Sequence, residues 1–271
     1  MFTFICRNWK RLTKDTLSAV TVIWLFVEMI IGLCEITCTI PFWCICIAIL
    51  LIYIITLWRA YRQKEKKLQI NHNNICIKFG DIFKESGNKV IAFNEYFDTK
   101  VDEKIISSKT LNGYVVKNHI KNIEQFDNEI QNDSYLKPIE TNVNRTNGGK
   151  TNKYELGSCF RHDDIIAVAF TKFDKNDNAR LTLNEYYCCL LNFWKELNRV
   201  YNSENMIIPL LGSGITRIEN GDKITSEEKL NILLHTLKYS GIFFSKDVTI
   251  TFVLNTSDKD NIKLYNIGYD I

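Results

Sequence analysis

Apolar residues form two long runs in the first quarter of the chain, and short apolar runs alternate with polar stretches in the rest. The long runs are Leu17–Cys34 and Ile40–Trp58, and the charged residues between their outer ends are Glu28 and Glu35. A helix needs about 20 apolar residues to cross the ~30 Å hydrocarbon core of a bilayer. Each run nearly reaches that length, so the pattern predicts two membrane-spanning helices joined by Glu35–Thr39.

Lys and Arg residues flank both runs on their outer sides, whereas the connector carries neither. Residues 1–67 hold nine Lys and Arg against four Asp and Glu, a net charge of +5, which leaves −2 of the chain's +3 for the remainder. Positive flanks favour the cytoplasmic side of a membrane. We therefore expect both termini in the cytoplasm and a lipid bilayer as partner. The basic flanks account for the positive balance, so no nucleic-acid partner is expected.

Glu28 is a carboxylate inside the first apolar run. Placing an ionised carboxylate in the hydrocarbon costs at least ~2.5 kcal/mol, so such groups usually face another helix or a water path. One interpretation is therefore a pore in which Glu28 lines the water path. The alternative is that Glu28 reaches the outer interface, because it lies close to Glu35.

After a charged linker, Arg59–Gln69, the pattern is typical of an α/β domain. Strands are predicted at Ile75–Lys78, Val90–Asn94, Ile165–Phe170, Met206–Leu210 and Val248–Leu254. Helices are predicted at Thr110–Ile123, where Thr110 is the expected N-terminal cap, Leu183–Asn202 and Ser226–Tyr239. Residues 122–154 are polar and are expected to form long loops around a weak helix or hairpin. The predicted organisation is an anchor at 1–67 and one globular module at 68–271.

The segment Asp174–Glu185 has oxygen-bearing side chains at the spacing of an EF-hand calcium loop. However, Ala179 replaces the glycine that the sharp turn of such a loop requires, and a predicted strand precedes it instead of a helix. We interpret the segment as an acidic turn that leads into a helix. The nine cysteines contain no Cys-x-x-Cys pair, and the four histidines are scattered, so we expect no metal site and no catalytic triad.

Polar or glycine-containing segments follow several predicted strands. They are Asp81, Asn94, the helix start Thr110–Gly113 and the loop Leu210–Arg217. Each one alone is more often an ordinary turn. In α/β sheets, however, ligands bind beyond the carboxyl ends of the strands, where backbone N–H groups and helix starts can receive a phosphate. Together, these segments predict an anion-binding site at one edge of the sheet.

The same segments resemble a macro domain, the ADP-ribose-binding α/β/α fold. The resemblance rests on Gly80-Asp-Ile-Phe83 after the first strand, on Asn94 after the second, on the Gly-containing helix start and on Pro209-Leu-Leu-Gly-Ser-Gly214. It covers residues 75–271. With two predicted spans in front, the chain is similar to the membrane-anchored macro effectors of type II Thoeris anti-phage systems. The implied fold class is α/β, with two N-terminal transmembrane helices before a three-layer α/β/α macro-type domain that has a mixed central sheet.

The resemblance also implies a ligand site. Asp81 would bind the adenine amine, Asn94 and Asn112–Gly113 would lie by the distal ribose and the first phosphate loop, and Gly212–Thr216 would wrap the diphosphate. The expected ligand-binding residues are Asp81, Ile82, Asn94, Thr110, Leu111, Asn112, Gly113, Leu211, Gly212, Ser213, Gly214, Ile215, Thr216, Arg217 and Asn255.

Two departures from the family's hydrolases bear on catalysis. Those enzymes carry a second Asn three residues after the first and an Asp in the Gly-rich loop, where this chain has Phe97 and Asn112. Without those groups nothing orients and activates a water molecule. We therefore expect ligand binding without hydrolysis, no catalytic residue and no cofactor.

By this resemblance the chain is a sensor in the bacterial inner membrane. A partner TIR-domain protein would make an ADP-ribose-derived nucleotide from NAD, histidine-ADP-ribose in this class. Its binding would favour a homo-oligomer that disrupts the membrane. Two alternatives stay open. One is a membrane-tethered ADP-ribosyl hydrolase or NADase in which Glu95 or Asp98 activates water, and the other is a structural scaffold with an inert domain.

Overall fold

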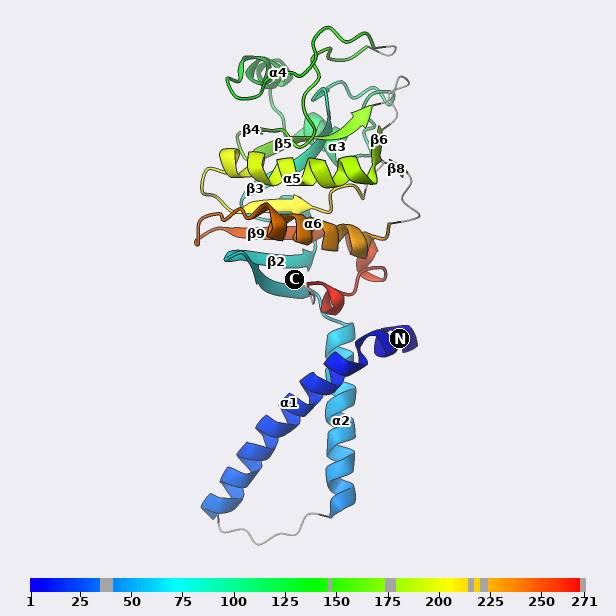
Figure 1. Cartoon of the computed structure of the whole chain (residues 1–271), viewed down its shortest axis with the longest axis vertical. Coiled ribbons are helices and arrows are strands. Elements are labelled where there is room, and N and C mark those ends of the chain that lie inside the picture. The colour runs from blue at the N-terminus through cyan, green and yellow to red at the C-terminus, as the bar shows by residue number, and fades with distance from the viewer. Residues whose placement is uncertain (35–40, 146–147, 174–178, 214–216, 220–223, 269–271) are drawn as a thin grey trace. The chain divides into compact units, whose positions relative to one another are not determined.

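The computed structural model describes residues 1–34, 41–145, 148–173, 179–213, 217–219 and 224–268. Its contacts divide the chain into two compact units, whose elements are labelled in Figure 1. The first unit comprises Met1–Lys64 together with Lys263–Asn266, and the second comprises Glu65–Ile262 with Ile267–Ile271. The division after Lys64 lies close to the predicted boundary after residue 67.

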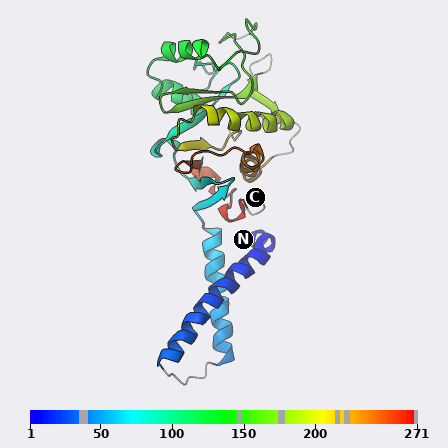
Figure 2. The same cartoon turned by 60° about the vertical axis from the view of Figure 1, so that its left-hand side comes forward.

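Two helices and a short C-terminal segment form the first unit. Its elements are α1 (Phe2–Cys34), α2 (Phe42–Tyr61) and the 3₁₀ helix η3 (Leu264–Asn266). The two long helices cross one another in both views (Figures 1 and 2). Phe4 and Leu12 of α1 pack with Ala60 of α2 and with Tyr265 of η3. The Tyr265 hydroxyl also donates to Asp15 Oδ2 at 2.7 Å, so the C-terminal segment belongs to the core of this unit.

Among the described residues, one helix is long and apolar enough to cross a membrane, and that helix is α2. The first predicted span is the C-terminal part of α1, a helix that begins at Phe2 and includes the charged residues between Arg7 and Asp15. The structure therefore gives one candidate span where two were predicted. The predicted connector, Glu35–Thr39, lies outside the described residues.

A mixed sheet forms the middle of the second unit. In the described residues its strand order is β1-β2-β9-β7-β3-β5-β6-β8, and β4 pairs with β5. Neighbours from β2 to β5 in this order are parallel, and so are β6 and β8. β1 pairs antiparallel with β2, and β4 and β6 pair antiparallel with β5. The strands are β1 (Glu65–Ile70), β2 (Asn73–Phe79), β3 (Asn88–Asn94), β4 (Cys159–His162), β5 (Ile165–Phe173), β6 (Ala179–Thr182), β7 (Met206–Pro209), β8 (Arg217–Glu219) and β9 (Thr249–Leu254).

Helices cover both faces of this sheet and form the predicted three layers. They are α3 (Leu111–Asn118), α4 (Ile123–Asn132), α5 (Leu183–Val200) and α6 (Ser226–Ser240), with 3₁₀ helices η1 (Ile82–Lys84) and η2 (Thr256–Lys259). In Figure 1, α5 and α6 lie in front of the sheet and α3 lies behind it. Successive residues of β9 point to opposite faces of the sheet and belong to the two hydrophobic cores there. Phe252 meets Trp194 of α5, with 6.4 Å between ring centroids. Val253 belongs to the cluster that contains Val115 of α3 and Phe126 of α4.

The five predicted strands are confirmed as β2, β3, β5, β7 and β9, and the last two predicted helices as α5 and α6. Both helices begin with a capping box, Thr182 with Glu185 in α5 and Thr225 with Glu228 in α6. In such a box the two side chains satisfy the exposed N–H groups of the first turn. Glu185, the last residue of the EF-hand-like segment, is thus part of a helix start, and 174–178 lie outside the described residues.

Two predictions about this unit are corrected. The charged linker Arg59–Gln69 contains the end of α2 and most of β1. β1 is an edge strand that buries only Ile70, and charged side chains suit such an edge. The predicted helix Thr110–Ile123 is two helices. α3 ends at Asn118, and Asn122 caps α4 by accepting a hydrogen bond from the Gln125 N–H at 3.0 Å.

Substitution of Gly113 tests how closely the start of α3 packs on the loop that precedes it. An added Cβ would lie 2.2 Å from the Ser107 carbonyl oxygen. Gly113→Ala must therefore shift the backbone, and overpacking of this kind costs about 1–3 kcal/mol. We expect a lower Tm in thermal denaturation of the full chain. Gly80→Ala is the matched control, because its Cβ would meet its nearest atom at 3.8 Å. Equal Tm values for both variants would contradict the packing.

Candidate functional site

A cavity of about 610 Å³ opens at the carboxyl ends of the parallel strands. Its walls come from the end of β3, the loop before α3, the first residues of α3, the end of β5 and the loop after β7. The lining residues are Ala92–Asn94, Glu103–Ser107, Lys109–Asn112, Phe170, Thr171, Phe173, Ala179 and Pro209–Ser213. The cavity therefore joins segments that are far apart in the sequence and brings polar loops over an apolar floor.

Several of the predicted ligand-binding residues line this cavity. They are Asn94, Thr110, Leu111, Asn112, Leu211, Gly212 and Ser213. Gly113 lies in the same helix start, and Thr110 Oγ1 caps that start by accepting from the Gly113 N–H at 3.0 Å. Gly214, Ile215 and Thr216 lie outside the described residues, and Arg217 is the first residue of β8.

Asp81, Ile82 and Asn255 do not line the cavity, although they follow β2 and β9 at the same edge of the sheet. Asp81 caps η1 by accepting from the Phe83 N–H at 3.0 Å, and Ile82 is buried in the core. Asn255 caps η2 by accepting from Ser257 N–H at 3.0 Å. Parallel pairing of β2 with β9 places these two caps on neighbouring strand ends, and their role in binding stays a prediction.

Asn94 uses its carboxamide to hold the turn that follows β3. Its Oδ1 accepts from the N–H groups of Tyr96 at 3.1 Å and Asp98 at 3.2 Å. Its Nδ2 donates to Asp98 Oδ2 at 2.9 Å. The side-chain oxygen of Asn94 is therefore engaged within the protein, at the point where the strand meets the cavity.

Asp98 is the centre of a buried ionic network behind Asn94. Arg145 Nη1 lies 2.7 Å from Asp98 Oδ2, and the two side chains are 4% and 1% exposed. The Lys150 N–H donates to Asp98 Oδ1 at 2.8 Å, and the Arg145 guanidinium lies 4.2 Å above the Tyr96 ring. Arg145 comes from the polar stretch 122–154, so a segment without sequence periodicity fixes the turn beside the cavity.

Glu95 follows the cavity-lining residue Asn94 but does not itself line the cavity. It is 2% exposed, accepts from the Phe173 N–H at 3.0 Å and lies 3.5 Å from Lys153 Nζ. Burial raises the pKa of its carboxyl group. Neither Glu95 nor Asp98 lines the cavity, and both are held by protein partners. The two carboxylates of the hydrolase alternative thus lie just behind the cavity wall, where protein partners engage them.

The loop before α3 is tightly ordered by its own carboxylates. Asp102 accepts from the N–H groups of Ile105 and Lys104, which lower its pKa to about 2. The Ser108 side chain and N–H, together with the Ser107 hydroxyl, lower the pKa of Glu103 to about 2. Glu103 has a φ of 62°, so the turn that these bonds hold is an unusual one. The loop is built as a fixed wall of the cavity.

Sequence reasoning missed two groups of cavity residues. The first is the pair Lys104 and Lys109, which are exposed and form no ion pair within the described part of the chain. The second is the aromatic pair Phe170 and Phe173 at the end of β5. Lysines and aromatics occur throughout the sequence, and only the convergence of distant segments distinguishes these four.

Asn112 adds an unsatisfied polar group to the cavity. Its Oδ1 is buried and has no hydrogen-bond partner in the described structure. A buried acceptor left without a donor costs ~1–3 kcal/mol. Because this oxygen is closed to solvent, a ligand hydroxyl or amine reaches it and removes that cost only when the Asn112 side chain turns toward the cavity.

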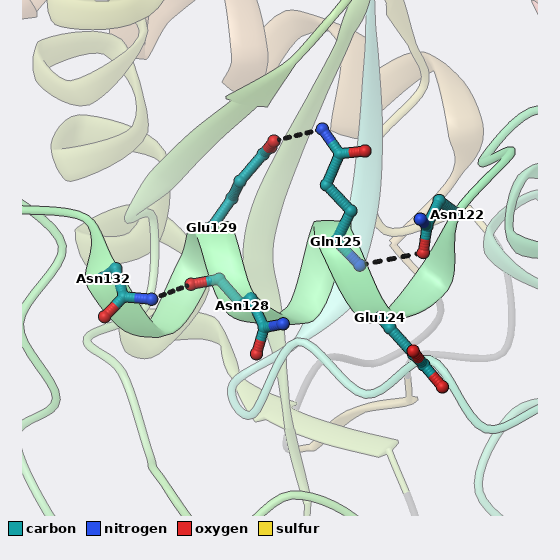
Figure 3. A pocket seen from close by; sticks show the side chains of 6 residues that line it. All are labelled: Asn122, Glu124, Gln125, Asn128, Glu129 and Asn132. Carbon is teal, nitrogen blue, oxygen red and sulfur yellow. Dashed lines mark hydrogen bonds between the residues drawn. The ribbon is translucent and has the colours of Figure 1, made fainter.

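A second hollow lies along α4, but it has the features of an ordinary helix surface. Figure 3 shows its six lining residues, all from α4 or its cap. Gln125 donates to Glu129 at 2.7 Å and Asn132 donates to the Asn128 carbonyl at 2.8 Å, so these side chains satisfy one another along the helix. No cluster of three metal-ligating side chains occurs among the described residues.

Comparison with known proteins gives a family and a close relative. The family described as Thoeris protein ThsA, Macro domain, matches residues 75–255. A curated protein named Thoeris protein ThsA, from Bacillus amyloliquefaciens (strain Y2), is 43% identical over 222 residues, which are 80% of this chain and 74% of that protein.

Among solved structures, the Oceanobacillus iheyensis macrodomain with MES bound is 16% identical, with a TM-score of 0.46 over 72% of this chain and 91% of that one. The same macrodomain with ADP is also 16% identical, with a TM-score of 0.44 over 72% and 90%.

The buried pair Arg145–Asp98 provides a stability test. Arg145→Met removes the cation and leaves the Asp98 carboxylate buried and without its ionic partner, which costs about 3–5 kcal/mol. Denaturant unfolding of the full chain should show this loss. Arg161→Met is the matched control, because the Arg161–Glu204 pair is separated by 3.4 Å at the surface. Exposed pairs contribute only ~0–1 kcal/mol. A similar, small loss in both variants would show that the network does not fix the turn.

Proposed function

The chain belongs to the family of the Thoeris protein ThsA macro domain, and from this premise we propose that its cavity binds an ADP-ribose-derived nucleotide. One observation carries the proposal. The ends of parallel strands, a capped helix start and a glycine-containing loop converge on one cavity of about 610 Å³. Helix starts and glycine loops are where proteins receive phosphate groups, because their N–H groups have no internal partner.

The chemistry of the cavity wall fits such a ligand. Lys104 and Lys109 provide positive charge for a diphosphate. Phe170 and Phe173 provide apolar and aromatic surface for a base or a ribose ring. Asn112 lines the cavity, and when its side chain turns toward the ligand its buried Oδ1 accepts a hydrogen bond from a ligand hydroxyl or amine. Each chemical part of an ADP-ribose derivative therefore has a complementary group in the wall.

We further propose that the chain is a sensor and not a hydrolase. The ligand is a signal made from NAD by a partner TIR-domain protein, of the histidine-ADP-ribose type. A ligand can shift a protein only toward the arrangement that it binds more tightly. Here that arrangement is a homo-oligomer, which disrupts the membrane as part of anti-phage defence.

The membrane part of this proposal rests on the first unit. α2 supplies the apolar helix, and its basic end residue Arg59 favours a cytoplasmic position for the unit that follows. Along the apolar part of α1, side chains such as Val22, Phe26 and Met29 are more than half exposed within the chain. Lipid or a second copy of the chain would cover them. The proposed location is the bacterial inner membrane, with the ligand-binding unit in the cytoplasm.

Titration of the full-length protein in detergent tests the ligand proposal. We expect heat on addition of ADP-ribose or histidine-ADP-ribose and no turnover product from either compound or from NAD. Ser213→Glu places a carboxylate in the cavity wall and should weaken binding at least about tenfold, or 1.4 kcal/mol, through like-charge repulsion. Ser213→Gln is the uncharged control of similar size. Product formation with turnover would favour the hydrolase, and absence of heat with every compound would favour an inert scaffold.

Glu28 tests the membrane step separately from binding. It accepts a hydrogen bond from Trp24 Nε1 at 2.7 Å, one turn back along α1. We propose that in the oligomer Glu28 faces the interior of the assembly, where a carboxylate can stay hydrated. Glu28→Leu should then abolish ligand-dependent depolarisation of cells and leave ligand affinity unchanged. Met29→Leu is the control on the same helix. Depolarisation that persists in Glu28→Leu removes this residue from the mechanism.

A further inference from the structure

The loop after β7 is held by side chains from two different helices. Tyr186 comes from α5, and its hydroxyl donates to the Leu211 carbonyl oxygen at 3.0 Å. Lys229 comes from α6, and its Nζ donates to the Gly212 carbonyl oxygen at 2.7 Å. Leu211 and Gly212 both line the cavity. Two consecutive carbonyl groups of the cavity wall are therefore fixed from behind.

Tyr186 contacts this loop with both its hydroxyl group and its ring. Its side chain is fully buried, and burial raises the pKa of its hydroxyl group. Its ring packs edge-on against Phe170 of the cavity floor, with 5.8 Å between ring centroids. The same ring lies 3.1 Å from the place where a Cβ on Gly212 would be, and Gly212 has a φ of +78°. A glycine is thus required in the loop, both for its backbone conformation and for the close approach of Tyr186.

Lys229 is an unusual partner for a carbonyl group, because its ammonium group is partly withdrawn from water. Desolvation lowers its pKa. A charged donor forms a stronger hydrogen bond to a carbonyl oxygen than a neutral donor does. Because the bond crosses from α6 to the loop, it fixes the peptide between Gly212 and Ser213. The Ser213 N–H is also fixed, since it donates to the Leu210 carbonyl at 3.2 Å.

Because the peptide group is planar, the hydrogen bond to the Leu211 carbonyl oxygen also determines the direction of the Gly212 N–H. In a trans peptide the carbonyl oxygen and the following N–H point to opposite sides. With the Leu211 oxygen directed at the buried Tyr186 hydroxyl, the Gly212 N–H points away from it. Gly212 lines the cavity, so this N–H is available to an anionic group there. A loop already fixed in this orientation loses little conformational entropy when a ligand binds.

We propose that Tyr186 and Lys229 are positioning residues for ligand binding, which hold the Leu211–Ser213 peptides so that the Gly212 N–H receives the diphosphate of the nucleotide. The inference rests on the proposed function and extends it to two residues outside the cavity wall. Neither side chain contacts the ligand in this mechanism. Both act through the orientation of the same short loop, so their effects on affinity should not be independent.

Four variants of the full-length protein test the inference by titration with ADP-ribose. Tyr186→Phe removes only the hydroxyl, and Lys229→Met removes the ammonium but keeps most of the apolar stem. Each should raise the Kd about 3- to 30-fold, the range of one or two lost hydrogen bonds. The double variant should raise the Kd by less than the product of the two single effects. Lys229→Arg keeps a charged donor and should recover most of the affinity.

Two further measurements separate positioning from other roles. In a plot of log Kd against log salt concentration, Lys229→Met should keep the wild-type slope. Lys104→Met should give a shallower slope, because it removes a charge that lines the cavity. Tyr187→Phe and Lys195→Met, on the exposed side of α5, are matched controls and should bind like the wild type. Wild-type affinity in Tyr186→Phe and Lys229→Met would overturn the inference, as would a fully multiplicative double variant.

Hydrogen exchange of the ligand-free protein keeps this test distinct from that of the proposed function. Both single variants should speed exchange of the Leu210–Ser213 amides relative to the two controls, because the loop loses a fixed contact. If the wild type binds neither ADP-ribose nor its histidine derivative, the proposed function fails, and exchange still decides whether these residues hold the loop. Unchanged exchange in both variants would overturn the positioning role itself.

Discussion

Parallel pairing of β2, β9, β7, β3 and β5 is the constraint on which the rest of the second unit depends. Parallel strands all end at one edge, so the segments that follow them must gather there, however distant they are in the sequence. Parallel sheets also need cover on both faces. α3 and α4 cover one face and α5 and α6 the other, which leaves the strand ends as the place where a cavity can open. The positions of Asn94, Thr171 and Leu211 around one cavity follow from this single arrangement.

The same constraint explains which parts of the fold were predictable from sequence. Strands buried on both faces appear as continuous apolar runs, such as Ile165–Phe170, and these were found. The strands β1, β4, β6 and β8 are short or carry charged residues, so none of them forms a continuous apolar run in the sequence, and they were missed. The predicted cap Thr110 gave the start of α3 to within one residue, because a cap is a local interaction. The predicted starts of α5 and α6 also agree with the structure, but their caps, Thr182 and Thr225, were not predicted. In the N-terminal unit, composition alone indicated two spans, whereas the continuity of α1 from its charged beginning is a property of the folded helix.

The candidate site was predictable in outline only. Gly212 and Asn94 follow recognisable strands, and their placement at the cavity agrees with the expected edge. Arg145 and Asp98 could not be paired from sequence, because 47 positions separate them and neither lies in a periodic pattern. The charge at the cavity could not be predicted from the net charge of the sequence either. The chain after residue 67 carries −2 overall, yet in the cavity wall Lys104 and Lys109 outnumber the one carboxylate, Glu103. Screening over a Debye length of ~8–10 Å makes these local charges decisive for an anion in the cavity.

The strongest argument for a sensor over a hydrolase is that the polar side chains beside the cavity already have hydrogen-bond or ion-pair partners within the protein. A water molecule must be oriented and deprotonated by groups within hydrogen-bond reach of it. The Asn94 oxygen is already occupied by two backbone N–H groups, and Asp98 is neutralised by Arg145. Phe97, at the position where the resemblance to macro hydrolases implies a second Asn, has a fully buried side chain in the core behind the cavity. Asn112 does face the ligand space, but a carboxamide has no basic group with which to take a proton from water. The carboxylates nearest to the cavity therefore serve to keep its walls in place, which favours the proposed sensor over a hydrolase.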